Sequence, residues 1–297
     1  MALTFAQMLQ VMKKRYPNFS GLWEQSRADF GPEWEDDIDL ALAKVFDDDE
    51  KAVEEIVDGY AEFSTDAIRS QIYFERKGEY KASNYDEVAQ AYYHNRDFMF
   101  RCYLPGMLVS HFVWPHHFRM LSWFRNLLTD LGPNVRTFCE VGTGCGLYSE
   151  QVLERVPSSR GIGYDISDSA LEFTKRVADS FGHGDLYDTT ACNIITNPPK
   201  EQFDLALSQE VLEHLEDPVA YMRALRNMVR PGRYAYIAAA INAAHVDHIY
   251  LYRSPDEVAT EIEEAGFTIL KRHSELAYTG KPLKVTPCHA GFLCQRD

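Results

Sequence analysis

The stretch TFCEVGTGCGLYSEQVL, residues 137–153, decides the fold of this chain. It reads as an apolar strand, a loop with glycine at positions 142, 144 and 146, and the start of an amphipathic helix. Glycines in such a loop let the backbone approach a ligand closely, and the first turn of the helix offers unpaired N–H groups. The sequence therefore predicts a ligand-binding loop at the end of a strand.

Two details separate this loop from the dinucleotide-binding pattern G-x-G-x-x-G. The third glycine of that pattern would fall at position 147, which is Leu147. Glu140, two residues before the first glycine, would repel a pyrophosphate, whereas it suits a ligand that carries positive charge. The loop therefore favours a cationic ligand over a dinucleotide.

A second acidic residue follows the next predicted strand. The stretch GIGYDIS, residues 161–167, places Asp165 at the end of that strand, about 20 residues beyond the glycine loop, where nucleotide-binding folds hold the ribose. A carboxylate at this place can accept hydrogen bonds from both hydroxyls of an adenosine ribose.

The two halves of the chain differ in texture. Up to about residue 130 the pattern is helical and holds all four tryptophans, which predicts a helical core, or a cap or dimer surface that lines a pocket. His116 and His117 are adjacent there, so we expect one of them at most to face a pocket. After residue 130, short apolar strands alternate with helices, as in βαβ units on a parallel sheet. Strands are expected at 136–141, 161–166, 203–208, 234–241, 267–276 and 284–295, and helices from Leu147, Ser167, Asp217 and Ser254.

With Glu140, the three loop glycines and Asp165 in this order, residues 130–297 resemble the class I S-adenosylmethionine-dependent methyltransferases. Four later stretches are similar to that family's motifs in their order, the second of them to its small-molecule branch: ACNIIT (191–196), FDLALSQEVLEHLEDP (203–218), LRNMVRPGR (225–233) and HIYLYRSPDEVATEIEEAGF (248–267). The resemblance implies an α/β fold with a Rossmann-like, doubly wound, seven-stranded sheet in residues 131–297, behind a helical cap or dimerisation domain in residues 1–130. It also implies S-adenosylmethionine as cofactor and S-adenosylhomocysteine as product.

The same resemblance implies which residues hold the cofactor. Asn193 would meet the adenine amino group, and Ile194 would lie against the ring. Tyr93, from the helical part, is expected to reach the methionine carboxylate. The remaining cofactor contacts are expected from Glu140, Gly142, Thr143, Gly144, Gly146, Asp165, Ile166, Ser208 and Gln209.

Histidines after the fourth and fifth expected strands are candidates for catalysis. His214 follows the fourth strand, and His245 and His248 follow the fifth, all at the edge where open α/β sheets bind ligands. An acceptor that must lose a proton needs a base, and histidine suits neutral pH. For His214 the alternative is a structural role or a contact with the cofactor. A minority hypothesis has His245, Asp247 and His248, with or without His214, bind a divalent metal, but the spacing lacks a second ligand set, so no metal is expected.

Charge and composition limit the partners. The 45 acidic residues exceed the 30 Lys and Arg residues by 15, which argues against nucleic acid as a partner because phosphate backbones are bound by basic surfaces. No stretch approaches the roughly 18 apolar residues of a membrane span, and the start does not resemble a signal peptide. The six cysteines form no C-x-x-C pair. We therefore expect a cytoplasmic protein with reduced thiols, no membrane partner and a possible homodimer through the N-terminal helices.

These observations favour one function and leave two others open. The leading hypothesis is methyl transfer by in-line displacement to a small-molecule acceptor, a biosynthetic or secondary metabolite. A peptide or protein methyltransferase is the first alternative, because the acidic helical part would suit a basic peptide. A non-catalytic S-adenosylmethionine-binding protein is the second. The motifs do not decide whether carbon, nitrogen, oxygen or sulfur is methylated.

Overall fold

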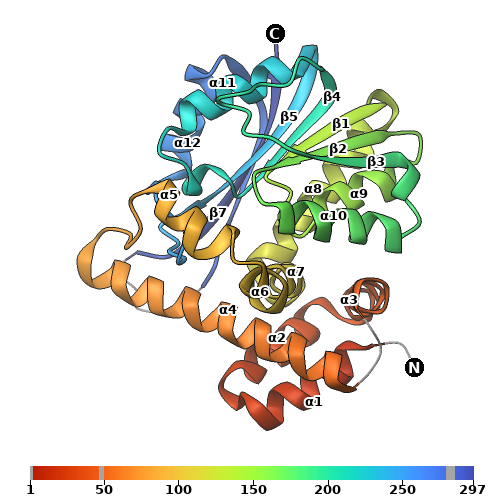
Figure 1. Ribbon diagram of the computed structural model, residues 1–297, viewed down its shortest axis with the longest axis vertical. Coiled ribbons are helices and arrows are strands. Elements are labelled where there is room, and N and C mark those ends of the chain that lie inside the picture. Colours follow the sequence, from red (N-terminus) through yellow and green to blue (C-terminus); the bar gives the residue numbers. More distant parts are fainter. Residues whose placement is uncertain (1–2, 47–49, 279–284) are drawn as a thin grey trace.

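The computed structural model describes residues 3–46, 50–278 and 285–297. These residues form one seven-stranded sheet of order β3-β2-β1-β4-β5-β7-β6, in which β7 runs antiparallel to both of its neighbours. Helices cover both of its faces, so the Rossmann-like α/β fold is confirmed (Figure 1). The strands are β1 (Thr137–Val141), β2 (Arg160–Asp165), β3 (Tyr187–Ala191), β4 (Phe203–Gln209), β5 (Val229–Ile241), β6 (Phe267–Leu276) and β7 (Cys288–Arg296).

Local capping explains where several helices begin. The side chains of Thr4, Ser167 and Ser254 each accept a backbone N–H of the following first turn, as Asp217 does before Pro218. Before the sheet lie α1 (Phe5–Arg15), α2 (Pro17–Phe30), α3 (Pro32–Val45), α4 (Glu50–Lys77), α5 (Tyr85–Val88), α6 (Arg96–Phe98), α7 (Leu104–Val113) and α8 (Pro115–Leu131). Between the strands lie α9 (Leu147–Arg155), α10 (Asp168–Ser180), α11 (Pro218–Met228) and α12 (Pro255–Glu264).

The predicted strands agree with the structure apart from three differences. β5 begins at Val229, five residues before the expected start at residue 234. β3 was not expected, because Tyr187 is its one buried residue and the sequence there has no apolar run. The strand expected from residue 284 begins at Cys288, and residue 284 itself lies outside the described residues. β3 is an edge strand, so its polar side chains face solvent without cost.

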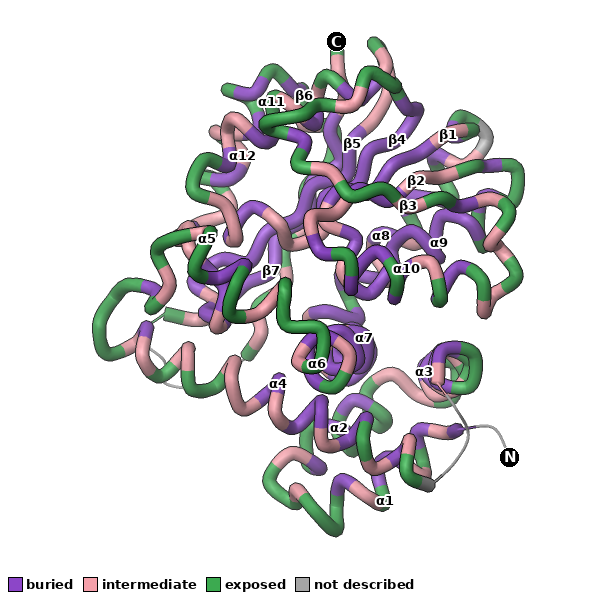
Figure 2. Tube along the Cα trace, in the orientation of Figure 1, coloured by how far each residue is buried: buried purple, intermediate pink, exposed green. Residues whose placement is uncertain are grey.

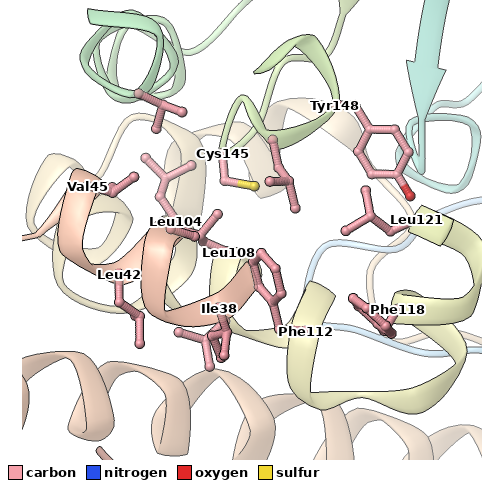
Figure 3. Close-up of a cluster of buried hydrophobic side chains, with 14 of the residues drawn as sticks. Ile38, Leu42, Val45, Leu104, Leu108, Phe112, Phe118, Leu121, Cys145 and Tyr148 are labelled. Atoms are coloured by element: carbon pink, nitrogen blue, oxygen red, sulfur yellow. The ribbon is translucent and has the colours of Figure 1, made fainter. Parts of the chain in front are cut away.

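One hydrophobic cluster joins the helical part to the sheet. Leu104 and Leu108 of α7 lie between Ile38 of α3 and Cys145 of the glycine loop (Figure 3). The same cluster continues through α8 and α9 to the sheet. In Figure 2 these segments and the central strands are largely purple, the colour of buried residues. Burying each such side chain contributes about 1.5–3 kcal/mol. The glycine loop therefore rests on a packed helical layer.

Two further observations bear on the expected environment. Among the residues that the structure describes, no helix combines the length and the apolar content needed to cross a membrane. All six cysteines are free thiols, and Cys192 is the one that is not buried.

Candidate active site

A cavity of about 830 Å³ opens at the carboxyl ends of β1, β2 and β4. This is where open α/β sheets bind ligands, and the volume lies within the range of small-molecule sites. The glycine loop and the strand ends line one side, while α2, α4 and α7 contribute to the other. In Figure 1, α7 is seen end-on between the sheet and the long α4. Both halves of the chain therefore build the site.

The glycine loop has the backbone conformation that its composition predicts. Gly142, Gly144 and Gly146 have φ angles of 75°, 50° and 73°, in the left-handed region that glycine adopts without strain. A Cβ on Gly142 would lie 2.5 Å from a methyl carbon of Val211. Gly142, Thr143 and Gly144 line the cavity, whereas Gly146 faces α10 at the start of α9. Gly142 and Gly144 therefore let a ligand approach the backbone, whereas Gly146 lets α9 and α10 pack closely.

Glu140 is buried beneath this loop. Its carboxylate accepts hydrogen bonds from the backbone N–H and the hydroxyl of Ser149, in the first turn of α9. Burial raises the pKa of Glu140 to about 8. The residue holds the helix start and also borders the cavity, so a cationic group bound nearby would favour its ionised form.

Glu140→Gln is expected to raise the melting temperature of the unliganded protein in alkaline but not in acidic buffer. The pKa of Glu140 is about 8 in the folded protein against an ordinary value of 4.5, so between these values the folded state holds a proton that the unfolded state has lost. Stability of the wild type therefore falls as the pH rises through this window. Thermal unfolding at about pH 5 and about pH 8 measures the difference. Glu154→Gln, on the exposed face of α9, is the control; an equal gain at both pH values would contradict the assignment.

Asp165 has unused hydrogen-bonding capacity toward the cavity. Its Oδ1 accepts the backbone N–H of Ser167 at 2.9 Å. Its Oδ2 lies 3.4 Å from the Thr143 hydroxyl and 3.5 Å from the Gly144 nitrogen, both long contacts. A carboxylate offers about four acceptor positions. One is taken by Ser167, and the two long contacts can be replaced, so Asp165 can accept two hydroxyl groups of a ribose. Ile166 lines the cavity beside it.

Asn193 and Ile194 lie where an adenine would be expected. Ile194 is buried and lines the cavity. The Asn193 side-chain oxygen accepts the backbone N–H groups of Ile195 and Thr196 at 3.0 and 3.3 Å. Both lone pairs of that oxygen are therefore in use, which leaves the amide NH₂ as a donor. The expected contact with an adenine amino group needs an acceptor, so a ring nitrogen is the better match for Asn193.

Ser208 and Gln209 lie on opposite faces of β4. The Ser208 hydroxyl is fully buried behind the strand and accepts a hydrogen bond from Tyr221 at 3.0 Å. Gln209 lines the cavity. Neighbouring residues of a strand point to opposite sides of the sheet, so of the two predicted contacts Gln209 is the one that the structure brings to the site.

Another part of the cavity wall is organised around His245 and Asp247. His245 Nδ1 lies 2.8 Å from one oxygen of Asp247, and Tyr103 and Tyr93 donate hydroxyl hydrogen bonds to the other at 2.6 and 3.0 Å. Burial alone would raise the pKa of Asp247, but His214 and His245 outweigh it and hold the pKa well below its ordinary range. An ionised carboxylate only accepts, so His245 Nδ1 carries the proton and Nε2 carries a lone pair. Among the described residues Nε2 has no hydrogen-bond partner.

Helix α4 braces the loop that carries His245. Gln71 donates to the Asn242 carbonyl at 3.2 Å and accepts the Ala244 N–H at 2.9 Å. Phe63 packs its ring 4.8 Å from the His245 ring. The imidazole is therefore held by contacts from α4 on one side and by Asp247 on the other.

The other two predicted histidines lie beside this pair. His214 Nδ1 is 3.1 Å from the Tyr93 hydroxyl, and the His248 ring is perpendicular to that of His214 with centroids 4.8 Å apart. His248 Nδ1 donates to the Ala243 carbonyl, and burial lowers the pKa of His248 to about 3. The Tyr93 hydroxyl is used by Asp247, so a contact with the methionine carboxylate would compete with that bond.

Asp247, which the minority hypothesis needs as a metal ligand beside His245 and His248, is engaged in other hydrogen bonds. The oxygens of Asp247 are taken by His245 and by two tyrosine hydroxyls. The residues whose ligand atoms do lie within reach of one ion here are Glu213, His214 and His248.

Two further side chains of the cavity, Glu210 and His289, were not predicted, and both lie near His117. Glu210 follows β4 with a left-handed φ of 50°, and its oxygens lie 3.9 Å from His117 Nε2 and 3.7 Å from His289 Nε2. Burial lowers the pKa of both histidines well below the ordinary value and raises that of Glu210 to about 7.

The expectation that one of His116 and His117 at most faces the cavity is wrong, because both line it at the start of α8.

The sheet order, the glycine loop and the acidic residues near the carboxyl ends of β1 and β2 are those of a class I S-adenosylmethionine-dependent methyltransferase domain, which lies in the C-terminal part of the chain. Residues 139–233 match the family model described as a methyltransferase domain. The ubiquinone biosynthesis O-methyltransferase of Nitrosospira multiformis is 27% identical over 149 residues, which are 44% of this chain and 62% of that protein. The match thus spans less than two thirds of the curated relative's length.

Two solved structures resemble most of the chain, including the helical part. An O-methyltransferase family protein from Burkholderia thailandensis has a TM-score of 0.58 at 14% identity, covering 91% of this chain and 86% of that one. The mitomycin 7-O-methyltransferase MmcR has a TM-score of 0.58 at 15% identity, covering 86% of this chain and 75% of that one. At this identity the likeness shows a common fold, in which a helical N-terminal part accompanies the sheet.

Proposed function

We propose that the protein transfers the methyl group of S-adenosylmethionine to a small-molecule acceptor and releases S-adenosylhomocysteine. One observation carries the proposal: the glycine loop, Asp165 and the free Nε2 of His245 belong to residues that line a single cavity. The cofactor supplies an electrophilic methyl group on a positively charged sulfur. Asp165 would hold its ribose, Ile194 its adenine, and the buried Glu140 would favour its positive charge.

His245 has the arrangement of a general base. Its Nε2 would take the proton of the acceptor as the new bond to the methyl group forms. Asp247 keeps the imidazole in the required tautomer and stabilises the imidazolium that results, as in other carboxylate-histidine pairs. An acceptor with an exchangeable proton is therefore favoured, and the names of the related O-methyltransferases favour a hydroxyl group.

The helical wall of the cavity favours an acceptor with an apolar body. Leu22 of α2 and Ile68 and Ile72 of α4 line the cavity, yet 37%, 46% and 44% of their surfaces remain exposed. Apolar side chains gathered at the rim of a cavity are typical of a binding site for an apolar ligand. We therefore propose a phenol with an aliphatic or aromatic substituent as the acceptor class.

A binding experiment tests the proposed cofactor site, and a turnover experiment tests the proposed acceptor class. Calorimetric titration with S-adenosylhomocysteine tests the cofactor site, and no binding at millimolar ligand would overturn the proposal. Incubation with deuterium-labelled S-adenosylmethionine and para-alkylphenols of increasing chain length, followed by mass spectrometry, tests the acceptor. Labelled product that increases with chain length is expected. Binding without transfer to any phenol, but with transfer to amines or basic peptides, would reject the acceptor class.

A further inference from the structure

The cavity wall holds three ligand-type side chains that the proposed methyl transfer does not use. His117 comes from the first turn of α8, Glu210 follows β4, and His289 comes from β7. The three residues are far apart in sequence, and all of them line the cavity. One ligand atom from each lies within 4.8 Å of the others.

Hydrogen bonds fix the tautomers of both imidazoles. The Ser110 hydroxyl donates to the Met107 carbonyl at 2.7 Å, so its oxygen is left to accept from His117 Nδ1, 3.4 Å away. The side-chain nitrogen of Gln209 lies 3.1 Å from His289 Nε2 and donates to it. Each Nε2 therefore carries a lone pair. That of His289 accepts the Gln209 N–H, so a metal ion bound there would replace this hydrogen bond. Both lone pairs belong to the nitrogens that lie nearest to the Glu210 carboxylate.

Such a group of acceptors lacks a positive charge at its centre. The nitrogen–oxygen distances of 3.9 and 3.7 Å are too long for hydrogen bonds, and the imidazoles are buried and neutral. Two ligands that each lie 2.0–2.2 Å from one metal ion are separated by about 3–4 Å. The two distances from Glu210 fall in this range, and the ligand atoms of all three residues lie within 4.8 Å of one another, so small side-chain movements would bring them around one ion.

The backbone at Glu210 adds an independent observation. Its φ of 50° is a conformation that residues other than glycine rarely adopt, and such strain tends to persist where a side chain must be aimed at a functional site. Glu210 N–H is paired with the Ala238 carbonyl of β5, so the strained conformation is fixed by the sheet.

We propose that His117, Glu210 and His289 bind a divalent transition-metal ion, such as Zn²⁺, Co²⁺ or Fe²⁺. Two imidazoles and one carboxylate are the donor set that these ions accept while keeping positions open for another ligand. The open positions would face the cavity. If the proposed function is also correct, a hydroxyl oxygen of the acceptor is the ligand that would bind there, and the ion would lower its pKa.

Cobalt binding to the full-length protein tests the site. After treatment with a chelator, the protein is titrated with Co²⁺ while the visible absorption bands of the bound ion are recorded. A stoichiometry of one ion per chain is expected. His289→Ala and Glu210→Gln should each weaken Co²⁺ binding by about 100-fold, the upper end of what losing even an outer-shell partner costs. His94→Ala is the control, because it removes an exposed histidine that belongs to none of the metal-compatible clusters among the described residues.

The outcomes separate this site from the neighbouring histidines and from the cofactor site. Unchanged Co²⁺ affinity in both His289→Ala and Glu210→Gln would overturn the proposal, as would absence of Co²⁺ binding to the wild type. Loss of binding in His248→Ala alone would place the ion on Glu213, His214 and His248 instead. Affinity for S-adenosylhomocysteine is measured on the same samples: its persistence shows that each variant is folded, and its absence in the wild type would reject the proposed function without affecting the cobalt result.

Discussion

His245→Ala is expected to lower the rate of methyl transfer to an alkylphenol by about 10²- to 10⁴-fold, the usual contribution of a positioned general base. The affinity for S-adenosylhomocysteine should stay unchanged, because His245 is not among the residues proposed to hold the cofactor. Single-turnover rates with labelled cofactor, together with calorimetry, measure the two quantities.

A matched control and a second variant make this result decisive. His94→Ala removes an exposed imidazole, and its rate should equal that of the wild type. Asp247→Asn should also slow transfer, since an amide cannot keep the Nδ1 proton in the same way. If His245→Ala loses less than about tenfold while His214→Ala loses more, His214 is the base.

Asp165→Ala is expected to raise the dissociation constant of S-adenosylhomocysteine by about 100-fold. The variant loses two hydrogen bonds to a charged group, each of which contributes about 1.5 kcal/mol. Since about 1.4 kcal/mol changes a dissociation constant tenfold, the two losses together give about 100-fold. Asp188→Ala, at an exposed position of the neighbouring β3, is the control and should leave binding unchanged. Since Asp165 also contacts Ser167 and Gly144, thermal unfolding of the variant is recorded as well. A folded Asp165→Ala variant with wild-type affinity would mean that the ribose binds elsewhere.

Much of the site follows from sequence because parallel strands end at one edge of a sheet. The strand before the glycine loop, the strand before Asp165 and the strand before His214 are short apolar runs bounded by polar residues, so their ends are clear. Once the strand ends are known, the edge rule brings Glu140, Asp165 and the histidines together without knowledge of side-chain packing.

Other parts of the site depend on facts that a linear pattern does not contain. Ser208 and Gln209 are both polar at the end of one strand, and the pleat decides which of them reaches the cavity. The left-handed backbone of Glu210 is not encoded by any glycine. His289 sits within CHAGFLC, which reads as an ordinary buried strand. Its neighbours His117 and Glu210 come from distant segments, so only the fold brings the three together.

Neighbouring positions of α4 have different roles, which bears on how acceptor specificity could change in evolution. Ile68 and Ile72 contact the space assigned to the acceptor, while Gln71 between them holds the backbone at Asn242 and Ala244. Mutations at the two isoleucines would alter which molecules are accepted and leave the cofactor cradle intact. A mutation at Gln71 would disturb the loop that carries His245, whatever the acceptor. Selection should therefore permit variation at positions 68 and 72 among descendants with new acceptors, and should retain glutamine at 71.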